Sequence, residues 1–360
     1  MNCSPDSLMI AAREFRRIPG GMLDGISSYL LCQIANKNAI PQTVLWSPAS
    51  AVASWTDSGG GHAGNLQTFL ATASMATVTS LSIIGKGLTS ISNLQLLPAL
   101  TDINVSNNSI VSLDVHGMTA LETITANINQ LASVNVSGCT SLGSLNINDN
   151  SVASINLSGL VNLSKLACSA NLISTLNLSD NSGLSAIFAS SQFPGLTAIT
   201  LPTDASGLVA LYCTNNLLTS IDLSGCYNLS ELSIGYNPGL TSIDVSAASG
   251  NISYLNADAC AITSISVDGI VTMYLLSMND NPITSVSVDG CVSLSDIEFY
   301  GCSLGNAAEN SLMTQMIASC ADMAGYLRID GGSNASLNAA GVTLKDTLVL
   351  GYGWSVDYNP

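Results

Sequence analysis

A repeat of about 21 residues runs through most of the chain and constrains the fold more than any other feature. Within each repeat, apolar residues recur at the first, fourth, sixth, eleventh, fourteenth and sixteenth places. Such a period is typical of a solenoid, in which each coil buries its apolar face against its neighbours. Repeats begin at Val78, Leu100, Leu121, Leu142, Leu163, Leu184, Leu208, Leu229, Ile252, Met273 and Leu294.

The repeat that begins at Leu142 illustrates the pattern, with inward Leu145 and Ile155. Its form resembles the leucine-rich repeat family, whose unit reads L-x-x-L-x-L-x-x-N-x-L at a period of about 20–29. Asn at the ninth place can bond the backbone of its own coil and the next. Asn occupies that place at 108, 129, 150, 171, 216, 237 and 281, whereas Lys86, Gln192, Cys260 and Cys302 depart from it.

The second half of each repeat alternates like a strand, which predicts strands on both sides of the coil. We therefore expect a mainly β fold with α caps: a leucine-rich repeat solenoid of about eleven coils over residues 78–305. Residues 306–360 predict a helix-backed C-terminal cap, with helices over 307–323 and 337–350 and strands over 326–330 and 354–358. Residues 41–77 read as a linker and N-terminal cap, because 41–65 contains Pro41, Pro48 and a Gly-rich stretch.

Residues 1–40 form a separate segment, predicted to be helical, with Ser4-Pro5 at a helix start. The segment resembles the short helical N-termini of tailed-bacteriophage structural proteins. That resemblance implies docking to a larger assembly, for which Arg13, Arg16 and Arg17 are the candidate residues. The start also lacks the basic and apolar regions of a secretory signal, which favours synthesis in the cytoplasm without one.

The charge of the chain limits its partners. Acidic residues number 24 and basic residues 8, for a net charge of −16. Such a balance argues against nucleic acid and anionic lipid as partners. No apolar run approaches the roughly 18–20 residues of a membrane helix, so membrane insertion is not expected.

Motifs for chemistry are weak, and we expect neither an enzyme nor a cofactor or metal site. The cysteines include no Cys-x-x-Cys, so buried reduced thiols are favoured over bridges, with Cys3–Cys32 as one alternative. His62 and His116 lack the partners of a hydrolytic site. Aspartates on the second strand could hold calcium, but a solvated polar face is favoured. They are Asp114, Asp222, Asp244, Asp268 and Asp289.

Aromatic residues are unevenly distributed along the first strand. The repeats from Val78 to Gly183 contain none, whereas outward places from Leu184 onward hold several, with carboxylates beside them. Aromatic faces with acids and amides can stack on sugars or anchor a protein, although such residues also favour strands in general. The candidate ligand-binding residues are Phe188, Tyr212, Tyr236, Tyr254, Asp258, Tyr274, Asp280 and Tyr300.

Two functions are therefore weighed. One is a non-enzymatic binding or display module, such as a tail fibre, adhesin or decoration protein of a virion, or a cell-surface protein, that recognises a glycan or a protein. The alternative is a self-assembling structural protein that forms filaments or layers, which implies a homo-oligomer. The expected location is a virion or extracellular surface.

Overall fold

The computed structural model describes residues 44–57, 60–72, 75–248, 250–320 and 324–360. The chain divides into two compact units, an N-terminal unit (residues 1–139) and a C-terminal unit (140–360). The predicted helices of residues 1–40, the three candidate docking arginines and the Cys3–Cys32 alternative lie outside the described residues.

Residues 45–64, expected to be an irregular connection, instead form three strands that cover the first coil. They are β1 (Leu45–Ser47), β2 (Ala53–Asp57) and β3 (Gly60–Gly64). Strand β2 pairs antiparallel with β3 and with the first solenoid strand, β4 (Ser80–Ser82). Helix α3 (Leu66–Thr72) follows, and its Phe69 ring lies 5.2 Å from Trp46 and 5.1 Å from Trp55. Buried aromatic area thus offsets the cost of ordering this Pro- and Gly-rich stretch.

The predicted coils of the N-terminal unit carry strands at both expected places. First strands β4, β6 (Asp102–Asn104) and β8 (Thr123–Thr125) pair in parallel. Second strands are β5 (Ser90–Ser92), β7 (Ser112–Asp114) and β9 (Ser133–Asn135), and β7 pairs with β9. Two short 3₁₀ turns, at Met75–Thr77 and Leu94–Leu96, complete this unit.

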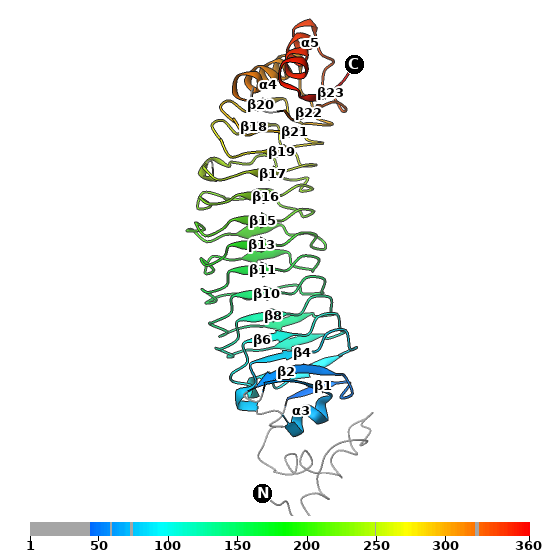
Figure 1. Cartoon of the computed structure of the whole chain (residues 1–360), viewed down its shortest axis with the longest axis vertical. Coiled ribbons are helices and arrows are strands. Elements are labelled where there is room, and N and C mark those ends of the chain that lie inside the picture. The colour runs from blue at the N-terminus through cyan, green and yellow to red at the C-terminus, as the bar shows by residue number, and fades with distance from the viewer. Residues whose placement is uncertain (1–43, 58–59, 73–74, 249, 321–323) are drawn as a thin grey trace, which may run out of the picture. The chain divides into compact units, whose positions relative to one another are not determined.

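The C-terminal unit continues the pattern with a parallel first-strand ladder, in which each strand pairs with that of the next coil (Figure 1). Its strands are β10 (Ser144–Asn146), β11 (Lys165–Ala167), β13 (Ala186–Phe188), β15 (Ala210–Tyr212), β16 (Glu231–Ser233), β17 (Tyr254–Asn256), β19 (Leu275–Ser277) and β21 (Asp296–Glu298). We call the outward side of this ladder the first-strand face.

The second half of these coils is less regular than expected. Within the described residues, only two strand pairs form there: β12 (Thr175–Asn177) with β14 (Ala198–Thr200), and β18 (Ser264–Ser266) with β20 (Ser285–Ser287). We call this side the second-strand face. Where no strand forms, the fourteenth-place side chain is only half buried, as at Ile155 and Ile221.

A left-handed residue at the eighth place turns every coil after its first strand. The first and last repeats use glycine there, Gly85 (φ 63°) and Gly301 (φ 70°). The repeats between them hold non-glycine residues with φ of 51–58°, which costs about 1–2 kcal/mol for an ordinary L-residue. They are Asn107, Ile128, Asp149, Ala170, Ser191, Asn215, Tyr236, Ala259 and Asp280.

The next residue, at the ninth place, points inward and joins coils as predicted. Asn171 donates from Nδ2 to the carbonyl oxygens of Cys168 (3.0 Å) and of Ile147 (2.9 Å) in the preceding coil. Its Oδ1 accepts from the Val152 N–H (3.0 Å). Gln192 makes the same kind of bridge, and the Cys302 thiol donates to the Met278 oxygen at 3.3 Å. Gln192 and Cys302 therefore keep the donor that the bend requires, whereas Lys86 in the first repeat is exposed.

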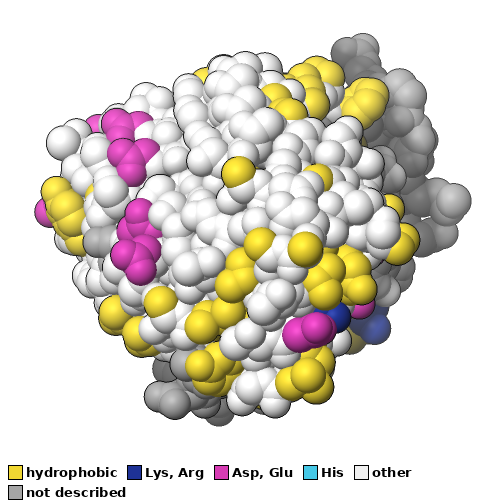
Figure 2. Space-filling view, turned by 90° about the horizontal axis from the view of Figure 1, so that it is seen from above, with side chains coloured by type: hydrophobic (Ala, Val, Ile, Leu, Met, Phe, Trp, Pro, Cys, Tyr) yellow, Lys and Arg dark blue, Asp and Glu magenta, His cyan; other side chains and the backbone are white. Residues whose placement is uncertain are grey.

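Two helix-backed segments follow the last repeat, close to the predicted bounds. Helix α4 (Asn306–Ser319) leads to β22 (Tyr326–Ile329), which pairs with β21. Helix α5 (Ala339–Asp346) continues as a π-helical turn (Thr347–Gly351) to β23 (Ser355–Tyr358). Figure 2 looks onto this end and shows apolar side chains together with several acidic ones. On α5 and the turn that follows it, Val342, Val349 and Leu350 are exposed. Among the described residues, no helix is long and apolar enough to cross a membrane.

Candidate binding face on the first strands

The first-strand face of the C-terminal unit brings together four of the aromatic candidates in two pairs. Phe188 and Tyr212 lie at paired positions of β13 and β15, and their rings stack at 5.2 Å with an interplanar angle of 10°. The Lys165 ammonium lies 5.5 Å from the centre of the Phe188 ring. Lys165 was not among the residues predicted from the sequence. The repeat already gives the parallel register, and that register places Lys165 one coil before Phe188.

The second pair consists of Tyr254 and Tyr274, whose ring centres are 6.4 Å apart. Glu231 lies between the two pairs, because its carboxylate accepts a hydrogen bond from the Tyr212 hydroxyl while its strand partner is Tyr254. That hydrogen bond, the largest cause, raises the pKa of Tyr212 to about 12. Burial, aided by Asp258, raises the pKa of Tyr254. We call Lys165, Phe188, Tyr212, Glu231, Tyr254 and Tyr274 the aromatic cluster.

A polar network continues this face toward the C-terminus. The Asp258 Oδ1 accepts hydrogen bonds from the Ser277 hydroxyl and from the Asn279 N–H, both at 2.7 Å. Asn256 donates to Asp258 Oδ2 at 2.8 Å, and Asn279 donates to Glu298 Oε2 at 2.6 Å. These bonds hold both carboxylates in fixed positions, and Asp258 lies near Tyr254, so the face offers an oriented acceptor next to an aromatic ring.

The remaining candidates lie away from the aromatic cluster. Tyr236 and Asp280 occupy the left-handed eighth place, so they project from the bend that follows the strand, and Tyr236 is 60% exposed. Tyr300 packs beneath Arg328, whose guanidinium lies 4.0 Å from the ring centre. Arg328 in turn donates to Asp330 at 3.0 Å. Tyr300 is therefore occupied by a cation–π contact within the cap.

The aspartates of the second-strand face bond either their own turn or the next coil, and Asp268 accepts hydrogen bonds from Ser287 and Asp289 of the next coil. Asp222 and Asp244 each accept the N–H of the Ser two residues on, both at 2.9 Å, and Asn177 does the same at 3.1 Å. Asp and Asn interchange at this place because the turn needs only an acceptor oxygen. In the described part of the chain, no group of three or more His, Cys, Asp or Glu is placed to hold a metal ion.

The other chemical candidates also fill structural places. His116 contacts Asp114 at 2.8 Å on an exposed turn, and His62 stacks on Trp55 at 5.5 Å. The prediction of buried free thiols is confirmed for all eight described cysteines. Burial raises the pKa of Cys168 and Cys213 to about 12, so these thiols are protonated and unreactive at neutral pH.

Comparison with known proteins shows the fold. No protein-family model matches the chain, and no curated protein matches its sequence. Among solved structures, the internalin InlF from Listeria monocytogenes superposes with a TM-score of 0.54 at 16% identity, over 82% of this chain and 93% of that one. The functional domain of InlJ from the same organism gives 0.50 at 15% identity, over 74% and 76%. The plant peptide hormone receptor RGFR1, solved in complex with RGF2, gives 0.54 at 16%, over 79% and 52%. This chain therefore has the β-solenoid fold of leucine-rich repeat proteins.

Proposed function

We propose that this protein is a non-enzymatic binding module that recognises a glycan or a protein ligand through the aromatic cluster on its first-strand face. The stacking of Phe188 on Tyr212, with Tyr254 and Tyr274 close by, carries the proposal. A parallel ladder holds these rings rigidly, so little side-chain freedom is lost when a ligand stacks on them. Tyr274 is exposed, and Phe188, Tyr212 and Tyr254 are half-buried. Partly exposed aromatic groups beside fixed carboxylates are typical of anchoring sites.

The charge of the region supports a ligand with hydrogen-bond donors. The sequence contains no Lys, Arg or His between Lys165 and Arg328. Glu231 and Asp258 therefore lie in a stretch without basic residues, whereas Glu298 lies beside its strand partner Arg328 at the C-terminal end of the face. Sugar hydroxyls and protein amines both satisfy such acceptors, and nucleic acid does not. The structure of the receptor RGFR1 in complex with RGF2 is an example of this repeat scaffold holding another molecule.

A double substitution tests the proposed face. Changing Tyr212 and Tyr254 together to Ser should weaken ligand binding about 5- to 150-fold, since aromatic contacts contribute about 0.5–1.5 kcal/mol each beyond buried area. Tyr227→Ser with Tyr352→Ser is the matched control, because both tyrosines lie outside the aromatic cluster. Glycan-array and cell-binding assays measure the effect. Unchanged binding by a folded double variant would mean that these tyrosines only stabilise the strands and do not contact the ligand.

We further propose that residues 1–40, with Arg13, Arg16 and Arg17, attach the protein to a larger assembly such as a virion or a cell surface. Deletion of residues 1–40 should leave the thermal unfolding of the solenoid unchanged, because its described coils are complete without them, and should abolish attachment. A truncated protein that fails to fold would make the segment part of the cap. Electron micrographs of the pure protein test the alternative of self-assembly, which requires ordered polymers rather than discrete particles.

A further inference from the structure

The second-strand face of the C-terminal unit contains a strand with one open edge. Strands β18 and β20 form a sheet of only two strands. Helix α4 covers the outer edge of β20, where the Val288 N–H donates to Gln315 Oε1 (2.7 Å) and the Gly290 N–H donates to Ser319 Oγ (2.9 Å). The other edge, along β18, faces the preceding coil, and within the described residues no strand pairs with it.

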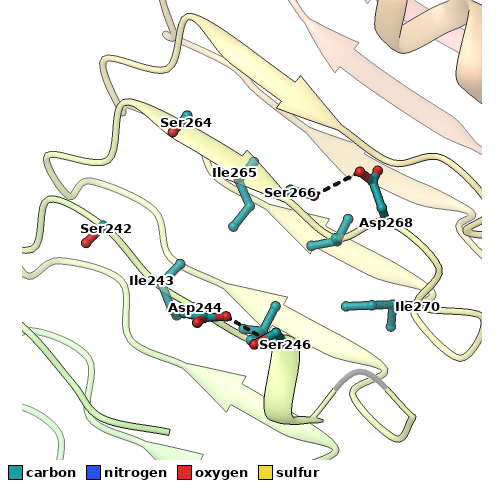
Figure 3. A pocket seen from close by; sticks show the side chains of 11 residues that line it. Ser242, Ile243, Asp244, Ser246, Ser264, Ile265, Ser266, Asp268 and Ile270 are labelled. Carbon is teal, nitrogen blue, oxygen red and sulfur yellow. Dashed lines mark hydrogen bonds between the residues drawn. The ribbon is translucent and has the colours of Figure 1, made fainter. Parts of the chain in front are cut away.

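A cavity of about 460 Å³ separates β18 from that preceding coil. Residues 242–246 form one wall, and residues 264–268 with Ile270 form the other. The coils are still joined just before the cavity, where the Ala261 N–H donates to the Leu240 oxygen at 2.9 Å. Ile243, Ile265 and Ile270 lie between the two chain segments, so the cavity has an apolar floor (Figure 3).

The direction of the backbone groups follows from the ladder. In a parallel pair, the N–H and C=O of alternate residues point to opposite neighbours. The Val267 N–H bonds the Ser287 oxygen in the next coil at 3.0 Å. Ser264 and Ser266, which alternate with Ile265 and Val267, therefore direct their backbone groups toward the cavity. An extended peptide placed there could satisfy them as an added strand.

The charges at the rim indicate the kind of peptide. Asp244 and Asp268 lie on opposite walls. Hydrogen bonds from Ser246 lower the pKa of Asp244. Burial opposes ionisation of Asp268, but hydrogen bonds from Ser287, Asp289 and Ser266 outweigh it and lower its pKa. Both groups are thus ionised at neutral pH, and neither has a basic partner nearby in the sequence.

We propose that this cavity binds an extended, lysine- or arginine-bearing segment of another protein, which adds as a strand to the open edge of β18. Main-chain hydrogen bonds to Ser264 and Ser266 supply the register, the isoleucine floor takes one side of the peptide, and Asp244 and Asp268 pair with its cations. The site is distinct from the aromatic cluster, which lies on the first strands, so the two proposals fail independently.

A labelled seven-residue peptide of alternating Lys and Val, titrated with the full chain by fluorescence anisotropy, tests the site. We expect saturable binding. A Lys–Pro peptide of equal charge should bind at least about tenfold more weakly, since proline has no N–H to donate and does not fit a ladder. Equal binding of the two peptides would mean that charge alone attracts them and would overturn the proposal.

Variants of the chain locate the binding. Asp244→Asn and Asp268→Asn keep the acceptor oxygen and should each weaken Lys–Val binding up to about fivefold, the range of an exposed ion pair. Asp222→Asn is the matched control, because it makes the same turn outside the cavity, and should change nothing. Ser266→Pro removes an N–H that points into the cavity and should reduce binding at least about tenfold.

Two outcomes would contradict the proposal even if Ser266→Pro fails to fold. The first is equal loss of peptide binding in the Asp222, Asp244 and Asp268 variants. The second is concentration-dependent self-association, measured by analytical ultracentrifugation, that the Lys–Val peptide reverses. That result would assign the cavity to a second copy of this chain instead of to another protein.

Discussion

The two faces of the C-terminal unit arise from the same repeat but differ in regularity. On the first-strand face every strand from β10 to β21 pairs with the strand of the next coil, whereas on the second-strand face the described part of the unit forms only two pairs. The longer repeats place their additional residues beyond the first strand. Asn237 and Leu240 are three places apart, for example, where Asn216 and Leu218 are two apart. The regular face can therefore vary its outward side chains on a fixed backbone, while the irregular face varies its backbone.

The largest expected difference in stability is between two substitutions in the same coil. Leu145→Asp should destabilise the protein by about 5 kcal/mol or more, because Leu145 is 0% exposed and a buried unpaired charge is costly. Ile155→Asp, in the second half of the same coil, should cost about 2 kcal/mol. Ile155 is only half buried, so the carboxylate of the introduced aspartate can reach water. Chemical denaturation measures both, and equal costs would contradict the difference between the faces.

The next largest loss of stability is expected from a substitution at the bend that follows the first strand. Asn171→Ala should cost about 3 kcal/mol, because it removes the bonds to Ile147 and Cys168 and leaves the buried Val152 N–H without its acceptor. Asn177→Ala, which removes one exposed turn bond to Ser179, should cost about 0.5–1 kcal/mol. Urea denaturation of the two variants gives the comparison, and a smaller effect at Asn171 would refute the inward ladder.

The helix that covers β20 should make the second-strand face sensitive to pH. Burial raises the pKa of Glu309 on α4 from its ordinary 4.5 to about 7, opposed in part by the backbone of Ala335. A carboxyl whose pKa rises on folding stabilises the fold fully below about pH 4.5, and this contribution is lost as the pH rises through about 7. Glu309→Gln should thus raise the free energy of unfolding at pH 8 by about 2 kcal/mol.

Thermal unfolding at pH 5 and pH 8 measures this effect. The wild type should lose stability between the two values by more than the Glu309→Gln variant does, and identical pH profiles would show that Glu309 does not titrate in the folded cap. Glu122→Gln in the N-terminal unit is a matched control, because Glu122 is exposed.

The smallest expected effect is a gain in stability from a substitution at the left-handed eighth place. Ile128 is β-branched, 50% exposed and held at φ 55°. Ile128→Asn should raise the free energy of unfolding by about 1 kcal/mol, since Asn tolerates the left-handed conformation and little burial is lost. The reverse change, Asn107→Ile, should cost about as much. Differential scanning calorimetry resolves both, and a loss in each variant would mean that packing of Ile128 outweighs its backbone strain.

Much of the fold could be predicted because periodicity determines which side chains are inward. First strands occur at the third to fifth places of each predicted repeat, and the Asn171 bridge follows from the ninth-place pattern. The left-handed eighth place could not be read, since residues as different as Ile128, Ala170 and Tyr236 occupy it. That geometry is imposed by the stacking of coils, which overrides the local preference of each residue.

The candidate site was predictable only in part, for a related reason. Phe188 and Tyr212 share the fifth place, so their contact follows from the register, whereas Tyr236 and Asp280 fall at the unseen bend. The cavity beside β18 depends on how far two coils separate. Ile243 and Ile265, which line it on opposite sides, have the same side chain in the same pattern, so no feature of either residue indicates that separation.

The buried thiols have a consequence for measurement. Each described cysteine is a free thiol shielded by its coil, from Cys139 in the N-terminal unit to Cys320 at the end of α4. A thiol reagent can modify such a group only when that stretch of chain opens, so the labelling rate reports a local opening equilibrium. The protein therefore carries native probes from residue 139 to residue 320, and mass-resolved labelling would record which of these coils open first without any introduced residue.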